Sequence, residues 1–188
     1  MTKALFFFRP KFWLSLLKIA ALVFVSGLIL VQIPELLYDL SSTKPVDISG
    51  PDELQSKNLS QTVFASVRGR PDFEKAFVYN RYGLSYTYFN LKPYGLSIVV
   101  RTYEPVTEEW KQLNRFLGKL RPFERQPFHY RIRDIYRDRF QATIPEDAFF
   151  LALDDVPRAN GWQIGALIFA CALWGVMGYM FYFYPWRR

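Results

Sequence analysis

Few residues of this chain have types and neighbours that suit catalysis. His129 is the only histidine, so a histidine-dependent triad has a single candidate and a zinc site built on paired histidines has none. Cys171 is the only cysteine, which excludes an internal disulfide and a cysteine-based zinc site. The adjacent acids Asp154 and Asp155 offer two carboxylates, fewer oxygen ligands than a hard cation takes. Because the sequence also lacks the motifs of phosphate-binding loops, zinc peptidases and serine hydrolases, we predict no catalytic residue, metal site or cofactor, and no enzymatic activity.

The residues best suited to binding lie in the basic stretch 115–139, which holds seven Arg and one Lys against three acids. Arginine makes bidentate contacts with carboxylates and, like tyrosine, is enriched in protein interfaces. The residues that we predict to bind a partner are Arg115, Arg121, Arg125, Arg131, Arg133, Arg137 and Tyr136. Two other interpretations stay open, which are contact with anionic lipid head groups and an ordinary solvated surface. The aromatic residues between the arginines favour a protein partner.

The basic stretch lies between two apolar segments near the ends of the chain, and these segments determine its position relative to a membrane. Residues 12–33 are apolar except for Lys18, Gln32 and two serines, and residues 162–184 carry no charge. Each segment has about the 20 residues that a helix needs to cross the hydrocarbon core of a membrane. The first segment could instead be a cleaved signal peptide, but it exceeds the usual apolar run of about 7–15 residues and no A-x-A cleavage site follows. We therefore predict an uncleaved signal anchor and a second transmembrane helix.

The distribution of charge predicts how these spans are oriented. All 17 acidic residues lie between Glu35 and Asp155. Six of the 24 basic residues lie at the two ends, and they are Lys3, Arg9, Lys11, Lys18, Arg187 and Arg188. Since positive residues stay on the cytoplasmic side, both termini are predicted in the cytoplasm and the middle of the chain in the periplasm. The middle of the chain has a net charge of only +1. A nucleic-acid-binding protein has a clustered basic domain, so we predict no nucleic-acid partner.

Small residues in the second span suggest that the two spans pack on each other. Gly161 and Gly165, with Ala166 and Ala170 after them, have the four-residue spacing that lets helix backbones approach in lipid. Small residues are also common in spans without that role. The sequence thus divides into a cytoplasmic tail (1–11), a transmembrane helix (12–33), a connector (34–60), an extracytoplasmic domain (61–160), a transmembrane helix (161–184) and a second tail (185–188).

The domain between the spans has the patterns of both strands and helices. Strands are predicted at 61–68, 76–81, 84–91 and 96–103, with turn signals at 69–72 and 92–95, which together indicate an antiparallel meander. An amphipathic helix is predicted over 107–120, because Trp110, Leu113, Phe116, Leu117 and Leu120 form one apolar stripe. A shorter helix over 131–140 and a last strand over 148–153 complete the domain. The predicted fold class is α+β, with two transmembrane helices flanking a small antiparallel β domain like a five-stranded OB barrel.

This layout resembles the SURF1-like group of oxidase assembly factors. The stretch Val67 to Pro71 (VRGRP) enters the strand meander, and Ile144 to Phe149 (IPEDAF) precedes the last strand, as in that group and in other membrane-anchored OB-like domains. The resemblance implies a non-catalytic accessory subunit or assembly factor of a larger integral membrane complex, respiratory or photosynthetic, in the inner membrane and in contact with membrane lipid. The same layout also suits an envelope scaffold or a regulator of glycan export or secretion. An enzyme with a carboxylate site is a third interpretation.

Overall fold

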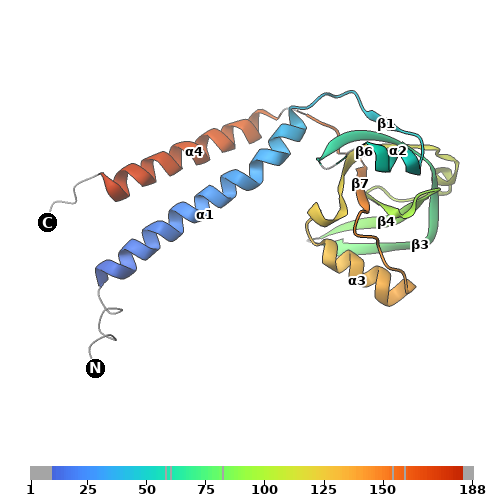
Figure 1. The fold of residues 1–188 in the computed structure, drawn as a ribbon, viewed down its shortest axis with the longest axis horizontal. Helices are drawn as coiled ribbons and strands as arrows, with labels where there is room; N and C mark the ends of the chain where they lie inside the picture. Colours follow the sequence, from blue (N-terminus) through green and yellow to red (C-terminus); the bar gives the residue numbers. More distant parts are fainter. Residues whose placement is uncertain are drawn as a thin grey trace. The chain divides into compact units, whose positions relative to one another are not determined.

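The computed structural model describes residues 10–183 except Asn58, Ser60, Tyr82, Asp154 and Ala159, and it describes no side chain for Pro10 and Lys11. The predicted tail 185–188, the predicted tail 1–11 up to residue 9, and Asp154 of the acidic pair lie outside the described residues. The chain divides into two compact units (Figure 1). The long apolar helices form one unit, and residues Leu40–Arg158 form the other.

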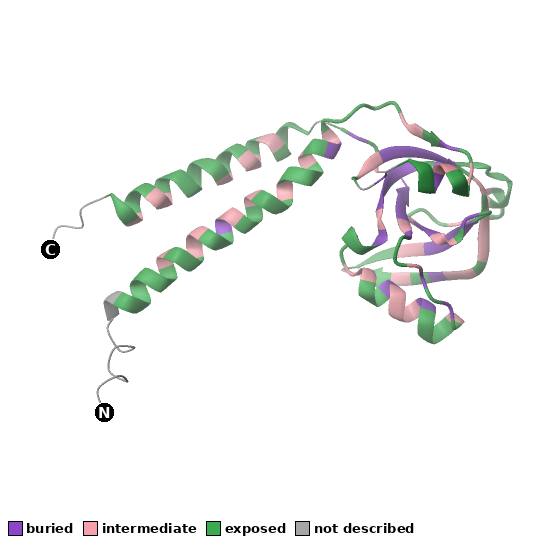
Figure 2. Cartoon of the chain, in the orientation of Figure 1, coloured by how far each residue is buried: buried purple, intermediate pink, exposed green. Residues whose placement is uncertain are grey.

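Both predicted spans are helices. Helix α1 (Pro10–Asp39) contains Pro34 and continues past it, and helix α4 (Gly161–Tyr182) begins at Asn160, whose side-chain oxygen accepts a hydrogen bond from the Trp162 N–H. Both helices are long and apolar enough to cross a membrane, and few of their residues are buried within the chain (Figure 2). They are therefore candidate membrane spans by length and composition.

Helices α1 and α4 pack against each other through polar contacts. The Trp174 Nε1–H donates to Ser26 Oγ at 2.9 Å, and Lys18 Nζ donates to the Phe181 carbonyl oxygen at 3.4 Å. Since Lys18 precedes Ser26 whereas Phe181 follows Trp174, the two helices run antiparallel and the amino end of α1 lies beside the carboxyl end of α4. A Cβ added at Gly161 or Gly165 would meet no atom within 4 Å, so this pair of glycines does not mediate a close approach of the two helices.

The other unit is built on one curved, seven-stranded sheet (Figure 1). Its elements in chain order are β1 (Val46–Ile48), α2 (Pro51–Ser56), β2 (Val63–Arg68), β3 (Arg70–Arg81), β4 (Leu84–Lys92), β5 (Gly95–Thr102), η2 (Glu108–Gln112), β6 (Arg115–Pro122), η3 (Phe123–Arg125), α3 (His129–Phe140) and β7 (Phe149–Leu153). The strand order is β1-β2-β6-β7-β5-β4-β3, with parallel pairing only for β1–β2 and β5–β7. The α+β class is thus confirmed.

The sheet differs from the predicted five-stranded barrel in its closure. Strands β1 and β3 are its two edges, and no ladder joins them among the residues that the structure describes, so a closed OB-like barrel is not observed. The predicted meander is confirmed for β3, β4 and β5, which pair in antiparallel order. Strand β2 instead pairs with β6, because only Gly69 separates β2 from β3 and the predicted turn over 69–72 is mostly strand.

The predicted helix over 107–120 is wrong. Only the short 3₁₀ turn η2 forms there, and the rest of the segment becomes β6, which pairs with β2 on one side and β7 on the other. Gly118 lies so close to β7 that a Cβ would collide with the Ala152 carbonyl, an approach that only glycine permits. In a strand Phe116 and Leu120 share one face, whereas Leu117 points to the other and is 46% exposed. Tertiary pairing here overrides the helical spacing.

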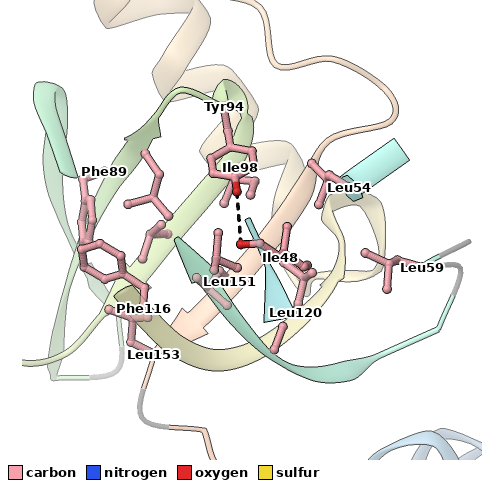
Figure 3. Packing of buried hydrophobic residues seen from close by; sticks show 14 residues of the cluster. Ile48, Leu54, Leu59, Phe89, Tyr94, Ile98, Phe116, Leu120, Leu151 and Leu153 are labelled. Atoms are coloured by element: carbon pink, nitrogen blue, oxygen red, sulfur yellow. Dashed lines mark hydrogen bonds between the residues drawn. The ribbon is translucent and has the colours of Figure 1, made fainter. Parts of the chain in front are cut away.

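Two hydrophobic clusters lie on the two faces of the sheet. The inner cluster is enclosed by the curved sheet and includes Ile48, Leu54, Phe89, Tyr94, Ile98, Phe116, Leu120 and Leu151 (Figure 3). The α3 cluster lies between the opposite face and helix α3, and it includes Phe77, Tyr88, Val99, Phe123, Ile132, Tyr136 and Phe150. The predicted helix over 131–140 is thus confirmed as α3, and the predicted last strand as β7.

Candidate functional site

The arginines predicted to bind a partner lie on three separate elements. Arg115 and Arg121 belong to β6, Arg125 to η3, and Arg131, Arg133 and Arg137 to α3. Arg115 begins β6 and Arg121 lies near its end, which places their Cα atoms about 20 Å apart at the usual rise of a strand. The basic stretch is therefore not one continuous surface.

Two of the four arginines of α3 have acidic partners close by. The Arg133 guanidinium lies 3.5 Å from Glu124 Oε1. The Arg137 guanidinium contacts Asp134 at 2.8 Å and Asp138 at 3.0 Å, and the hydrogen bond that it donates to Asp138 raises the pKa of Arg137. Arg131 is exposed on the same helix, with its guanidinium 5.7 Å from the centroid of the Tyr130 ring. Arg131 and Arg139 are thus the exposed arginines of α3 whose guanidinium groups stand over an aromatic ring, with that of Arg139 5.6 Å from the centroid of the Phe140 ring.

The two arginines of β6 both make contacts within the sheet, although Arg115 is exposed and only Arg121 is buried. Arg115 reaches Asp47 Oδ1 at 2.7 Å and also donates to Ser66, so it links β6 to β1 across β2. A hydrogen bond from Ser66, together with the charge of Arg115, lowers the pKa of Asp47. Arg121 is buried, in register with Phe150 of β7. Both arginines contribute to packing of the strands.

Tyr136 is a core residue and not a surface contact, which corrects its place in the predicted site. Its side chain is fully buried in the α3 cluster. Its hydroxyl donates to Asn90 Oδ1 at 2.9 Å, and the Asn90 amide donates in turn to the Ile98 carbonyl at 3.0 Å. Burial raises the pKa of the Tyr136 phenol, so the hydroxyl remains a donor at any physiological pH. This relay ties helix α3 to strands β4 and β5.

His129 begins α3 and has a structural contact. Its Nδ1 lies 3.0 Å from the Gln126 carbonyl oxygen, and its ring stands edge-on to Phe123. Cys171 is exposed on α4. Among the residues that the structure describes, no three His, Cys, Asp or Glu side chains gather closely enough to hold a metal ion.

A cavity of about 200 Å³ lies where the β3–β4 hairpin meets the start of α3. We call it the arginine–aromatic pocket, and its defining residues are Tyr79, Arg81, Tyr86, Tyr88, Arg101 and Phe128. The strand register brings them together, because Tyr79 pairs with Tyr86, and Tyr88 with Arg101, across β3, β4 and β5. Four aromatic rings and two guanidinium groups therefore converge beside helix α3.

The two arginines of this pocket stand over aromatic faces. The Arg81 Cζ lies 3.5 Å from the centroid of the Phe128 ring. The Arg101 Cζ lies 4.9 Å from the centroid of Tyr86 and 5.4 Å from that of Phe150. Such contacts contribute about 0.5–1 kcal/mol at exposed sites and about 2 kcal/mol when water is excluded. Burial raises the pKa of Tyr88, so its phenol stays protonated beside the arginines.

Phe128 has a backbone conformation that bulky residues seldom adopt. Its φ angle is 65°, in the left-handed region, immediately before α3. A non-glycine residue in this region costs about 1–3 kcal/mol, and such residues concentrate at functional sites. The left-handed turn places the Phe128 ring under the Arg81 guanidinium, so the strain is coupled to the shape of the pocket.

Sequence reasoning missed most of this pocket. The predicted strand over 84–91, which is observed as β4, contains Tyr86 and Tyr88. Arg81 and Arg101 lie on the neighbouring strands and reach these tyrosines only through the register of the ladders, which a single sequence does not specify. Comparison of the chain with protein-family models, characterised proteins and solved structures gives no match, so the resemblance to the SURF1-like group stays a hypothesis.

Proposed function

We propose that this chain is a non-catalytic accessory subunit or assembly factor of a larger integral membrane complex. The observation that supports it best is the concentration of arginine and aromatic side chains at one end of the β domain. The arginine–aromatic pocket adjoins exposed residues of α3, since the Phe128 ring lies 6.2 Å from that of Tyr130, which is half exposed beside Arg131. Arginine and tyrosine are the residues that most often anchor protein interfaces.

The two apolar helices supply the membrane anchor of the proposed accessory protein. Their antiparallel packing supports a topology in which both chain ends lie on one side of the membrane. With basic residues concentrated in both tails of the sequence, we propose cytoplasmic termini in the inner membrane and a periplasmic β domain. A protein anchored in this way meets its partners both in the bilayer and at the membrane surface.

Purification of the tagged, full-length protein in mild detergent tests this proposal. We expect a larger membrane complex to copurify and to comigrate with the protein on a native gel. The double variant Tyr130→Ala, Arg131→Glu should release that complex, because losing a buried charge contact in an interface costs about 2–5 kcal/mol. The control is Lys111→Glu, which reverses an exposed cation on η2.

Two results would contradict the proposal or move its interface. If no complex copurifies with the wild-type protein, the accessory function is wrong. If the double variant retains the complex and only replacement of α4 by an unrelated apolar helix releases it, the interface lies in the bilayer and not on α3.

A further inference from the structure

We infer that the arginine–aromatic pocket binds a carboxylate group carried on an apolar or aromatic body, and that a partner polypeptide supplies it. The polypeptide source rests on the proposed accessory function, whereas the carboxylate chemistry rests on the pocket alone. The β domain thus recognises a carboxylate of its partner.

Arg101 carries a charge that the described part of the domain does not neutralise with a carboxylate. This residue is half buried on β5, and among the described residues no carboxylate pairs with it. Other arginines of the domain have such a partner, as Arg115 has Asp47 at 2.7 Å and Arg137 has Asp134 at 2.8 Å. A cation that is partly removed from water without a counterion is costly, and the rings of Tyr86 and Phe150 offset that cost only in part.

The geometry of a guanidinium stacked on a ring also favours a carboxylate ligand. A guanidinium stacked on a ring keeps its N–H groups at its edge, where they form the fork that matches the two oxygens of a carboxylate. Arg81 is stacked in this way on Phe128, and the protonated phenol of Tyr88 lines the same cavity. A carboxylate in the pocket therefore meets donors of the right kind.

The size and lining of the pocket suit a small group. The cavity of about 200 Å³ is smaller than the typical small-molecule site of about 300–1,000 Å³. It suits one side chain or one chain terminus rather than a cofactor. Leu84, Pro127 and Ile132 complete its wall with apolar surface, against which the body that carries the carboxylate packs.

The backbone holds the pocket in a binding-ready form. Phe128 keeps its left-handed conformation at the start of α3, and Ile132 anchors the next turn of that helix in the α3 cluster. Strained residues persist only where the surrounding structure fixes them. The ring under Arg81 is therefore in place before a ligand arrives.

Benzoate and benzamide test the carboxylate chemistry directly, because they have nearly the same shape and differ in charge. Binding to the full-length protein in detergent micelles is measured by saturation-transfer NMR, in which the aromatic proton signals of the ligand report binding. We expect saturable benzoate binding in the millimolar range and at least about tenfold weaker binding of benzamide, since charge-assisted hydrogen bonds are roughly twice as strong as neutral ones.

Variants of Arg101 locate the site. Arg101→Met should abolish benzoate binding, and Arg101→Lys, which keeps the charge but loses the bidentate fork, should weaken it. The matched control is Arg70→Met, an exposed arginine at the opposite end of β3 from Arg81. Should Arg101→Met fail to fold by circular dichroism, the lysine variant and the benzamide comparison still decide the question. Equal binding of benzoate and benzamide, or no binding of either, would overturn the inference.

Copurification in the same variants tests the source of the carboxylate. We expect Arg101→Met to release the complex that the wild-type protein captures and Arg70→Met to retain it. If benzoate binds through Arg101 but Arg101→Met retains the complex, the ligand is a free carboxylate and the polypeptide source is wrong, while the proposed accessory function stands. If the wild-type protein captures no complex, the accessory function and the polypeptide source both fall, and the benzoate result alone decides the chemistry of the pocket.

Discussion

The two faces of the sheet in the β domain are packed in different ways. The inner cluster is mainly aliphatic, and the side chains that fill it, such as Leu91, Ile98 and Leu151, are fully buried. The α3 cluster is rich in aromatic rings, contains the polar relay from Tyr136 to Asn90, and borders the arginine–aromatic pocket. One face is thus a closed apolar core, and the other is a layer of rings and hydrogen bonds that adjoins a cavity.

This difference separates what stabilises the domain from what shapes its binding site. Aliphatic burial contributes free energy of folding roughly in proportion to area and has little directionality. Aromatic rings and buried hydrogen bonds fix orientations, because a misplaced partner leaves a polar group unsatisfied. We therefore expect mutations on the inner face to change stability most, and mutations on the α3 face to change the pocket.

The largest expected effect is on the inner face. Leu120→Ala should lower the free energy of unfolding by about 2–5 kcal/mol, because Leu120 is fully buried in the inner cluster. Leu117→Ala on the same strand is the control, and at 46% exposure it should cost about 0.5 kcal/mol or less. Denaturant unfolding of the full-length protein in detergent, followed by near-ultraviolet circular dichroism, measures both. If both variants lost the same free energy of unfolding, the two faces of β6 would not differ in burial.

An intermediate effect is expected from the relay under α3. Tyr136→Phe removes the hydroxyl that donates to Asn90 and leaves a buried acceptor without that bond, at a cost of about 1–3 kcal/mol. Tyr130→Phe is the matched control on the same helix, since Tyr130 is half exposed. If Tyr136→Phe leaves stability unchanged but weakens benzoate binding, the relay positions the pocket without stabilising the fold.

The smallest expected effect is the dependence of stability on pH near β1. The pKa of Glu53 is lowered first by the backbone N–H of Ser49 and then by Lys57. A carboxyl whose pKa is lowered by folding contributes stability above its ordinary pKa of about 4, and this contribution is lost as the pH falls through the folded-state value. The difference between wild type and Glu53→Gln should therefore be greatest at neutral pH and vanish in acid. If the difference in the free energy of unfolding grew on acidification instead, folding would raise the pKa of Glu53 and not lower it.

Much of the fold could be predicted where one local signal dominated. The apolar runs of α1 and α4, the alternation in β4 and the amphipathic spacing of α3 each have one plausible period. The segment from Glu108 to Pro122 has two, because its apolar residues fit a helical stripe, while Phe116, Gly118 and Leu120 also have the two-residue spacing of one face of a strand. The contact of Gly118 with β7 decides between them, and it involves residues far apart in the sequence.

The candidate site was predictable only in part for a similar reason. The composition of 115–139 correctly indicated arginines with aromatic neighbours, and Arg131 does lie exposed on α3. Tyr136, which is predicted to bind a partner, faces the core, whereas Tyr130, which precedes the predicted helix over 131–140, faces outward. The arginines of the pocket come from β3 and β5, and only the ladder register makes them neighbours.

The position of β7 has a consequence for how the domain is made. It is the last strand of the chain, yet it lies in the middle of the sheet between β6 and β5. The β3–β4 and β4–β5 hairpins join strands that are neighbours in the sequence, so they can form early. Strand β2 can pair with β6 only after β6 has been made, and the β1–β2–β6 part of the sheet can join the β5–β4–β3 part only after β7 has been made. Until Leu153 leaves the ribosome, β5 and β6 each present an unpaired edge that other chains can join. Biosynthesis of this protein therefore has a late, aggregation-prone stage, and chaperones that cover strand edges should matter most at that stage.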